Sequence, residues 1–208
     1  MAITTLNLRA LNRSDTASSG QLVTATSATA MDFQDAAGGA WNFISNTTIS
    51  DDATILVEGL DSTYKLYQFV FMNINNDTDD VIYYLRVKSG GSIISPNYRY
   101  VSHGWRDPNN AQNWAANDST FMRLNNNGNE AGTAETQNHI LYMWNPASTS
   151  SWTHIYSFGS YTNDDDDHYV THNSGVWDQT AAVTGLQLSA SSGTFTTGNI
   201  LLYGQKMS

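Results

Sequence analysis

The chain has 208 residues, a formal net charge of −10 and no cysteine. Its nine basic residues are scattered among 19 acidic ones, which excludes a nucleic-acid-binding surface, because phosphate backbones are bound by clustered Lys and Arg. The absence of cysteine excludes disulfides and thiol catalysis, and no apolar run approaches the length of about 20 residues that spans a bilayer. Only 13% of the residues are charged, so neutral Asn, Ser, Thr and Gly must supply most of the polar surface, which is typical of extracellular or particle-exposed β-proteins.

We expect residues 1–30 to form an N-terminal arm or docking segment ahead of a domain that spans residues 31–208. A short apolar element at residues 3–11 precedes a low-complexity stretch of small residues, TASSGQLVTATSATA, of the kind found in arms and linkers. Polar and charged residues interrupt the apolar element, which is unlike a signal peptide. A first strand of the following domain is the alternative interpretation of this segment.

Residues 59–87 (GLDSTYKLYQFVFMNINNDTDDVIYYLRV) carry the strongest strand pattern of the chain. In residues 64–74 apolar side chains alternate onto both faces of the expected strand, and a strand with two apolar faces is normally covered on both sides. Residues 75–80 (NNDTDD) tolerate turn geometry, and residues 81–87 supply a second strand. We therefore expect a hairpin at the centre of a sheet in a two-layer fold.

Further strands are expected on both sides of this hairpin, separated by turns rich in Asn, Gly and Ser. They cover residues 41–49, 53–58, 97–102, 120–124, 137–145, 152–158, 186–188, 194–196 and 199–207. Residues 103–117 (HGWRDPNNAQNWAAN) have no clear period and predict a long loop, a type of segment that is often functional. No stretch holds the i, i+3, i+4 apolar spacing of a helix. About ten short strands predict an all-β fold, a two-layer antiparallel β-sandwich of the jelly-roll or lectin-like type.

The expected loop carries the residues for a glycan site. Trp105 and Trp114 offer rings on which a sugar can stack, and Asn109 and Asn113 offer amides for its hydroxyl groups. This combination of ring and amide indicates a lectin-like surface. In the alternative interpretation, each Trp closes an open end of the sandwich and has no ligand.

The sharpest local feature is a run of four carboxylates, Asp164, Asp165, Asp166 and Asp167. Adjacent carboxylates repel one another, and a bound Ca²⁺ would relieve that repulsion. A calcium loop interleaves its ligands with turn residues and a Gly, which this run lacks, so a solvated surface loop is the alternative. On a strand, His168 and His172 would lie about 13 Å apart, which excludes joint chelation. Apart from the calcium hypothesis, we expect no cofactor.

The motifs of common enzyme classes are missing from the sequence. It contains no Gly-x-Ser-x-Gly, P-loop, Rossmann or His-Glu-x-x-His pattern. Its three Glu residues, Glu58, Glu130 and Glu135, are not paired with an Asp as in a glycosidase dyad. A glycoside-cleaving sandwich stays a third hypothesis, because two carboxylates can meet in space without being close in sequence. The sequence favours a protein that is not an enzyme.

Three segments resemble a group of virion proteins from tailed phages that infect aquatic bacteria. They are residues 59–74 (GLDSTYKLYQFVFMNI), residues 138–157 (NHILYMWNPAS and the strand after it) and residues 185–204 (GLQLSASSGTFTTGNILLYG). Proteins of this group carry a GLDSTYDEYVF-like hairpin and a terminal F-x-x-G-x-I-x-LYG strand, which residues 59–64 and 195–204 match. The resemblance implies a jelly-roll or concanavalin-like sandwich displayed on a particle, and its motifs carry no catalytic residues.

We therefore expect a non-enzymatic structural protein of a phage virion, either a capsid decoration or a tail or fibre component. It would be assembled in the host cytoplasm and exposed on the extracellular particle. Its partners would be capsid or tail subunits and further copies of itself, with a homotrimer as the working hypothesis, because particles are built from symmetric assemblies. The alternative is a glycan-binding, lectin-like receptor-binding module of the tail, with a host-surface glycan as partner. Neither nucleic acid nor a membrane is expected as a partner.

Overall fold

The computed structural model describes residues 21–25, 31–35, 41–107, 110–126, 128, 131–132, 135–163 and 165–206. The chain divides into two units, Met1–Ala40 and Trp41–Ser208. In the first unit, β1 (Gln21–Ala25) pairs antiparallel with β2 (Met31–Asp35). The second unit begins at Trp41, and residues 31–35 lie in the first unit, where they pair with β1. The expected apolar docking element at residues 3–11 lies outside the described residues.

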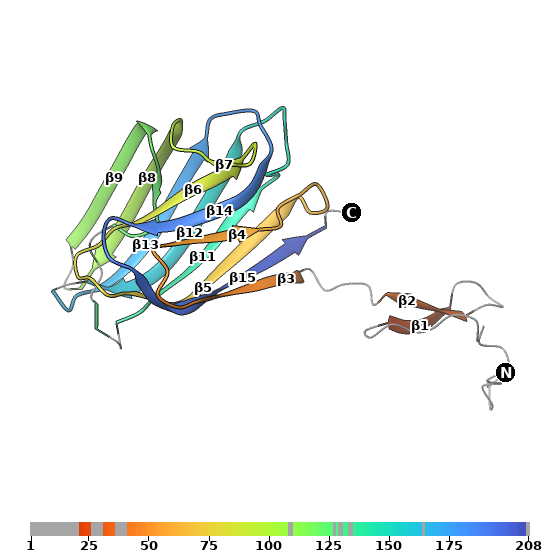
Figure 1. Cartoon of the computed structure of the whole chain (residues 1–208), viewed down its shortest axis with the longest axis horizontal. Coiled ribbons are helices and arrows are strands. Elements are labelled where there is room, and N and C mark those ends of the chain that lie inside the picture. Colours follow the sequence, from red (N-terminus) through yellow and green to blue (C-terminus); the bar gives the residue numbers. More distant parts are fainter. Residues whose placement is uncertain are drawn as a thin grey trace. The chain divides into compact units, whose positions relative to one another are not determined.

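Two antiparallel sheets packed against each other make up the second unit (Figure 1). The large sheet has eight strands in the order β3 (Asn42–Ile49), β15 (Phe195–Gln205), β5 (Leu66–Asn76), β11 (Gln137–Trp144), β12 (Thr153–Thr162), β13 (His168–Trp177), β8 (Tyr98–Arg106) and β9 (Asn110–Ser119). The small sheet has the order β10 (Met122–Arg123), β6 (Tyr83–Ser89), β14 (Val183–Ala190) and β4 (Thr54–Glu58), with β7 (Ser92–Ile93) paired to β6. The fold is therefore an all-β, two-layer antiparallel β-sandwich, as the sequence predicted. The described residues form no helix that could cross a membrane.

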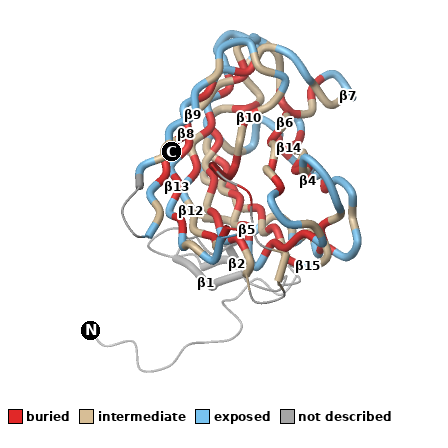
Figure 2. Tube along the Cα trace, turned by 90° about the vertical axis from the view of Figure 1, so that its left-hand side faces the viewer, coloured by how far each residue is buried: buried red, intermediate tan, exposed pale blue. Residues whose placement is uncertain are grey.

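The core lies between the two sheets, because each strand turns one set of alternate side chains inward. On β5 the inward side chains include Tyr67 and Phe69, and on β6 they include Tyr83 and Leu85; none of the four is more than 1% exposed. Figure 2 shows such buried positions along the strands of both sheets. Burial of this aromatic and aliphatic layer is the main force that holds the sheets together, since apolar area removed from water stabilises a fold by about 25 cal/mol per Å².

The predicted hairpin of residues 59–87 is wrong, because its two arms lie in different sheets. β5 pairs with β15 and β11 in the large sheet, whereas β6 pairs with β10, β14 and β7 in the small one. Asp77 fixes the crossing, since its carboxylate accepts hydrogen bonds from the backbone N (2.9 Å) and Oγ1 (2.8 Å) of Thr194. Alternation looks the same in strands that pair edge to edge and in strands that pack face to face, so the pattern could not distinguish the two arrangements.

The predicted long loop at residues 103–117 is also wrong. Residues 103–106 belong to β8 and residues 110–117 to β9, and the two strands pair from Tyr98 opposite Ser119 to Arg106 opposite Asn110. β9 is an edge strand and most of its described side chains are exposed, so it needs no apolar period. The strands expected at residues 137–145 and 152–158 are confirmed as β11 and β12.

We predict that Gly159→Ala destabilises the sandwich by about 1–3 kcal/mol, the usual cost of overpacking a core. Gly159 lies opposite His139 in the β11–β12 pair. A Cβ at this position would lie 2.1 Å from His139 Nδ1 and 2.4 Å from the Asn138 carbonyl oxygen. The free energy of unfolding in urea measures the effect, with Ser160→Ala on the neighbouring residue as the control. Equal stability of the Gly159 variant and the parent protein would contradict this packing.

Candidate binding face

The outer face of the large sheet, by which we mean the side turned away from the small sheet, is the candidate functional site. Cross-strand partners share a face, so the strand registers define rows of side chains across it. One row contains Phe43, Tyr203, Gln68, Tyr142, Tyr156, Ser174, Val101 and Ala115. The next contains Leu201, Val70, Ile140, Phe158, His172, His103 and Asn113. Both rows are mainly aromatic and aliphatic.

Much of this apolar surface is accessible to solvent. β5 is central in its sheet, as predicted, but only its inner face is buried; Met72 on its outer face is 37% exposed. The expectation that both faces of this strand are covered is therefore wrong for the described residues. Val101 at 60% and Phe158 at 36% are further examples of exposed outer-face side chains. Contiguous apolar surface of this kind marks a site of interaction more often than it marks an ordinary monomer surface.

Hydrogen bonds and ring contacts hold the outer-face side chains in place. The Tyr142 hydroxyl accepts a hydrogen bond from Gln68 Nε2 at 3.0 Å, and the Tyr156 hydroxyl lies 3.0 Å from His172 Nδ1. The Trp105 ring meets the His103 ring edge to face, with centroids 4.0 Å apart. Side chains fixed in this way lose little conformational entropy when a partner binds.

The charge of the outer face differs from that of the chain as a whole. Among the outward-facing described residues of β5, β11, β12, β13 and β8 there is no Asp or Glu, although the chain has a net charge of −10. Arg99 and four histidines do face outward from these strands, namely His103, His154, His168 and His172. These described residues therefore do not form the facing carboxylate pair that glycoside hydrolysis requires. They offer rings, amides and imidazoles, which suit non-covalent binding.

Two hollows lie on the outer face. The larger, of about 620 Å³, is lined from four strands, with Arg99 and Val101 of β8, Asn117 of β9 and His154 of β12 among its residues. The smaller, of about 430 Å³, is lined mainly by apolar side chains of β5, β11, β12 and β13. The face is thus shaped as well as apolar, which is a property of ligand and partner sites.

The structure separates the residues of the predicted glycan site. Trp105 lies on the outer face, and so does Asn113, which pairs with His103 through a side-chain hydrogen bond. Trp114 is the cross-strand partner of the buried Ser102 and lies on the opposite face, with its ring centroid 4.3 Å from the Arg123 guanidinium. Asn109 lies outside the described residues. Trp114 therefore does not share a face with Trp105 and Asn113.

Several outer-face residues were not assigned to a site from the sequence. They include Tyr142, Trp144, Tyr156 and Arg99. The alternation in residues 137–145 and 152–158 did place the aromatic members of this group on one face of each strand. What the sequence could not show is that, among the described residues, no further sheet covers this outer face.

Asp165, Asp166 and Asp167 of the acidic run lie in the turn between β12 and β13. Asp167 Oδ2 lies 2.8 Å and Asp165 Oδ2 lies 3.9 Å from Arg106 Nη1, so one cation is shared by both carboxylates. Asn163 closes the turn through hydrogen bonds with the backbone N and O of Asp167. Asp164 lies outside the described residues, and the described ones contain no group of three or more His, Cys, Asp or Glu side chains that could hold a metal ion. Arg106 thus compensates part of the negative charge of Asp165 and Asp167.

Comparison of the chain with family models, curated proteins and solved structures gave no match. Any functional assignment therefore has to come from the residues and their arrangement.

Behind the outer face, one end of the core is polar. His139 and Gln137 both point inward from β11, and their side chains bond through Nε2 and Oε1 at 2.9 Å. Asn173, inward on β13, donates to the Leu124 carbonyl oxygen at 2.8 Å and to Ser157 Oγ at 3.0 Å. Burial lowers the pKa of His139 from 6.5 to about 3, because the interior disfavours the imidazolium cation.

We predict that His139 makes the protein sensitive to acid. Unfolded chains take up a proton at this residue below pH 6.5, whereas the folded protein does so only near pH 3, so the stability that is complete above pH 6.5 falls as the pH drops toward 3. His139→Gln should flatten this fall by up to about 1.4 kcal/mol per pH unit. Urea unfolding at a series of pH values measures the slope, and the same change at the exposed His154 controls for loss of a histidine. Parallel profiles of the His139 variant and the parent would contradict the prediction.

Proposed function

We propose that this protein is a non-enzymatic structural protein on the surface of a tailed-phage particle, either a capsid decoration or a tail or fibre component, and that the outer face of its large sheet is its binding surface. The observation that carries the proposal is the open aromatic and apolar face, which extends over neighbouring strands and has no carboxylate among its outward-facing described residues on β5, β11, β12, β13 and β8. Interfaces are enriched in aromatic residues and depleted in acidic ones in the same way.

Two further features support a role on a particle. The β-sandwich is of the type that the resemblance of residues 59–74 and 185–204 implies, and the outward-facing described residues of β5, β11, β12, β13 and β8 include no Asp or Glu. The N-terminal residues 1–40 form a separate unit, and we assign them the anchoring role. In this arrangement the anchor binds capsid or tail subunits, while the outer face stays free for the partner outside the particle.

The first test is a cryo-electron-microscopy map of the particle whose genome encodes this chain, at a resolution that places Trp and Tyr side chains. We expect density for the sandwich on the capsid or the tail, in groups of three copies, with the outer face pointing away from the particle. Absence of the protein from the particle would overturn the virion role. An outer face buried against the shell would overturn the assignment of the binding surface.

A glycan-binding, receptor-recognition module is the second candidate. The observation that favours it is the cluster of Trp105, His103 and Asn113 on the outer face, in which a ring that can stack on a sugar lies beside groups that can bond hydroxyls. Trp105 is 49% exposed, so the ring is available to a ligand.

For this candidate we predict that Trp105→Ala lowers adsorption to host cells roughly tenfold, because exposed Trp residues often dominate binding energy. Leu56→Ala, at a 36% exposed position on β4 of the small sheet, is the control and should adsorb normally. Binding of labelled protein to whole cells gives the readout, and thermal unfolding confirms that both variants fold. A double variant, Trp105→Ala with Trp114→Ala, that adsorbs like the parent would contradict the glycan function.

A further inference from the structure

The larger hollow on the outer face has the chemistry of a site for one sugar ring. Its lining comes from β9, β8, β13 and β12, and four neighbouring strands at about 4.8 Å spacing span roughly 14 Å. This width accommodates a pyranose ring lying flat on the sheet. The outward side chains of Val101 and Val176 make part of the lining apolar, while Asn117 and Ser174 add hydrogen-bonding groups beside them. A pyranose has the same division, with a face of C–H groups and an edge of hydroxyls.

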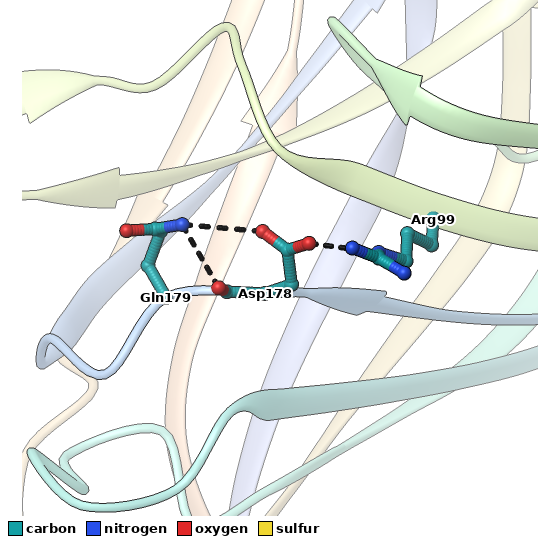
Figure 3. A network of polar contacts seen from close by, with 3 residues as sticks. All are labelled: Arg99, Asp178 and Gln179. Atoms are coloured by element: carbon teal, nitrogen blue, oxygen red, sulfur yellow. Dashed lines mark hydrogen bonds and ion pairs between the residues drawn. The ribbon is translucent and has the colours of Figure 1, made fainter.

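Arg99 is held at the rim of this hollow by two neighbours. Its Nε donates to Asp178 Oδ2 at 2.7 Å, and its guanidinium lies 5.7 Å from the centroid of the Trp152 ring. Asp178 in turn accepts a hydrogen bond from Gln179 Nε2 at 3.2 Å, which completes the network in Figure 3. Arg99 stays 51% exposed, whereas the Asp178 side chain is only 12% exposed. The guanidinium is therefore preorganised and accessible at once.

The pairing of Arg99 with Asp178 also decides the charge of the ligand. A carboxylate beside the guanidinium compensates its charge, so the pair presents a donor and an acceptor with little net charge. Sugar hydroxyls both donate and accept, and they match such a pair. An acidic ligand would have to compete with Asp178 for Arg99. We propose that this hollow is a subsite for a neutral saccharide, with Val101 and Val176 contacting the ring and Arg99 and Asn117 bonding its hydroxyls. This inference rests on the proposed function, because it names the class of ligand that the same outer face would bind.

The test measures binding of the full chain to the methyl glycosides of glucose, galactose, mannose and N-acetylglucosamine, and to methyl glucuronide as the acidic counterpart of the glucoside. Saturation-transfer NMR and intrinsic Trp fluorescence report binding. We expect at least one neutral glycoside to bind, and methyl glucuronide to bind more weakly than methyl glucoside. Failure of all four neutral glycosides to bind, or a preference for the glucuronide, would overturn the assignment.

Three variants locate the site. Val101→Glu changes a residue that is 60% exposed, so it should leave the fold intact while it weakens binding of the neutral glycoside at least tenfold. Leu56→Glu, on the small sheet, is the control and should bind normally. Asp178→Asn removes the compensating charge from Arg99, and it should shift the preference from the glucoside toward the glucuronide. An unchanged preference would contradict the charge argument, and loss of binding in Trp105→Ala with Val101→Glu unaffected would place the ligand at Trp105 instead.

Failure of this inference and failure of the proposed function can be told apart. A chain that is found on the particle and adsorbs to cells through the outer face, but binds none of the neutral glycosides, would overturn the saccharide subsite alone. If Val101→Glu abolishes self-association in light scattering while no glycoside binds, the hollow is an interface between copies of this chain, which also overturns the subsite. Absence of the protein from the particle overturns the virion role and leaves the glycoside result unaffected.

Discussion

The face-to-face packing of the two sheets, with β5 in the large sheet and β6 in the small one, is the constraint on which the rest of this structure depends. Consecutive strands that enter different sheets define the two layers, and the crossing between them is fixed where Asp77 binds Thr194 at the start of β15. Phe195 follows at once and packs edge to face on Tyr83, with ring centroids 5.0 Å apart. The large sheet has eight strands, and the small sheet has five. One face of the large sheet is buried by this packing, and the other has exposed apolar side chains such as Val101 and Phe158.

Local pattern was enough to predict the fold class, and it was not enough to predict which strands pair. Alternation in β5, β11 and β12 identified strands and sorted their side chains into two faces correctly. It could not tell a hairpin from a crossing between sheets, because both place the same side chains on the same side. Residues 103–117, the end of β8 and most of β9, were predicted as a loop, because the edge strand β9 is held by backbone hydrogen bonds and needs no apolar period. β13 was missed because it turns Thr171 and Asn173 into the polar end of the core.

The candidate site could be predicted only in part. Trp105 and Asn113 do share a face, but Trp114 lies on the other side of the same sheet, because residues an odd number apart on a strand point in opposite directions. Arg99 and Asp178 are 79 residues apart in sequence and meet only through the pairing of β8 with β13. The two apolar faces of β5 were visible in the sequence, and they now have a physical explanation. One face packs in the core, and the other belongs to a surface with the composition of an interface.

The central claim is that the outer face of the large sheet is the surface that this protein presents to its partner. Hydroxyl-radical footprinting of the intact particle, free and bound to host cell envelopes, tests this claim most directly. It predicts that Trp144, Trp152 and Phe158 are oxidised in the free particle and protected after binding, while Leu56 and Tyr84 on the small sheet react equally in both states. Protection confined to the small sheet, or outer-face rings already protected in the free particle, would contradict it.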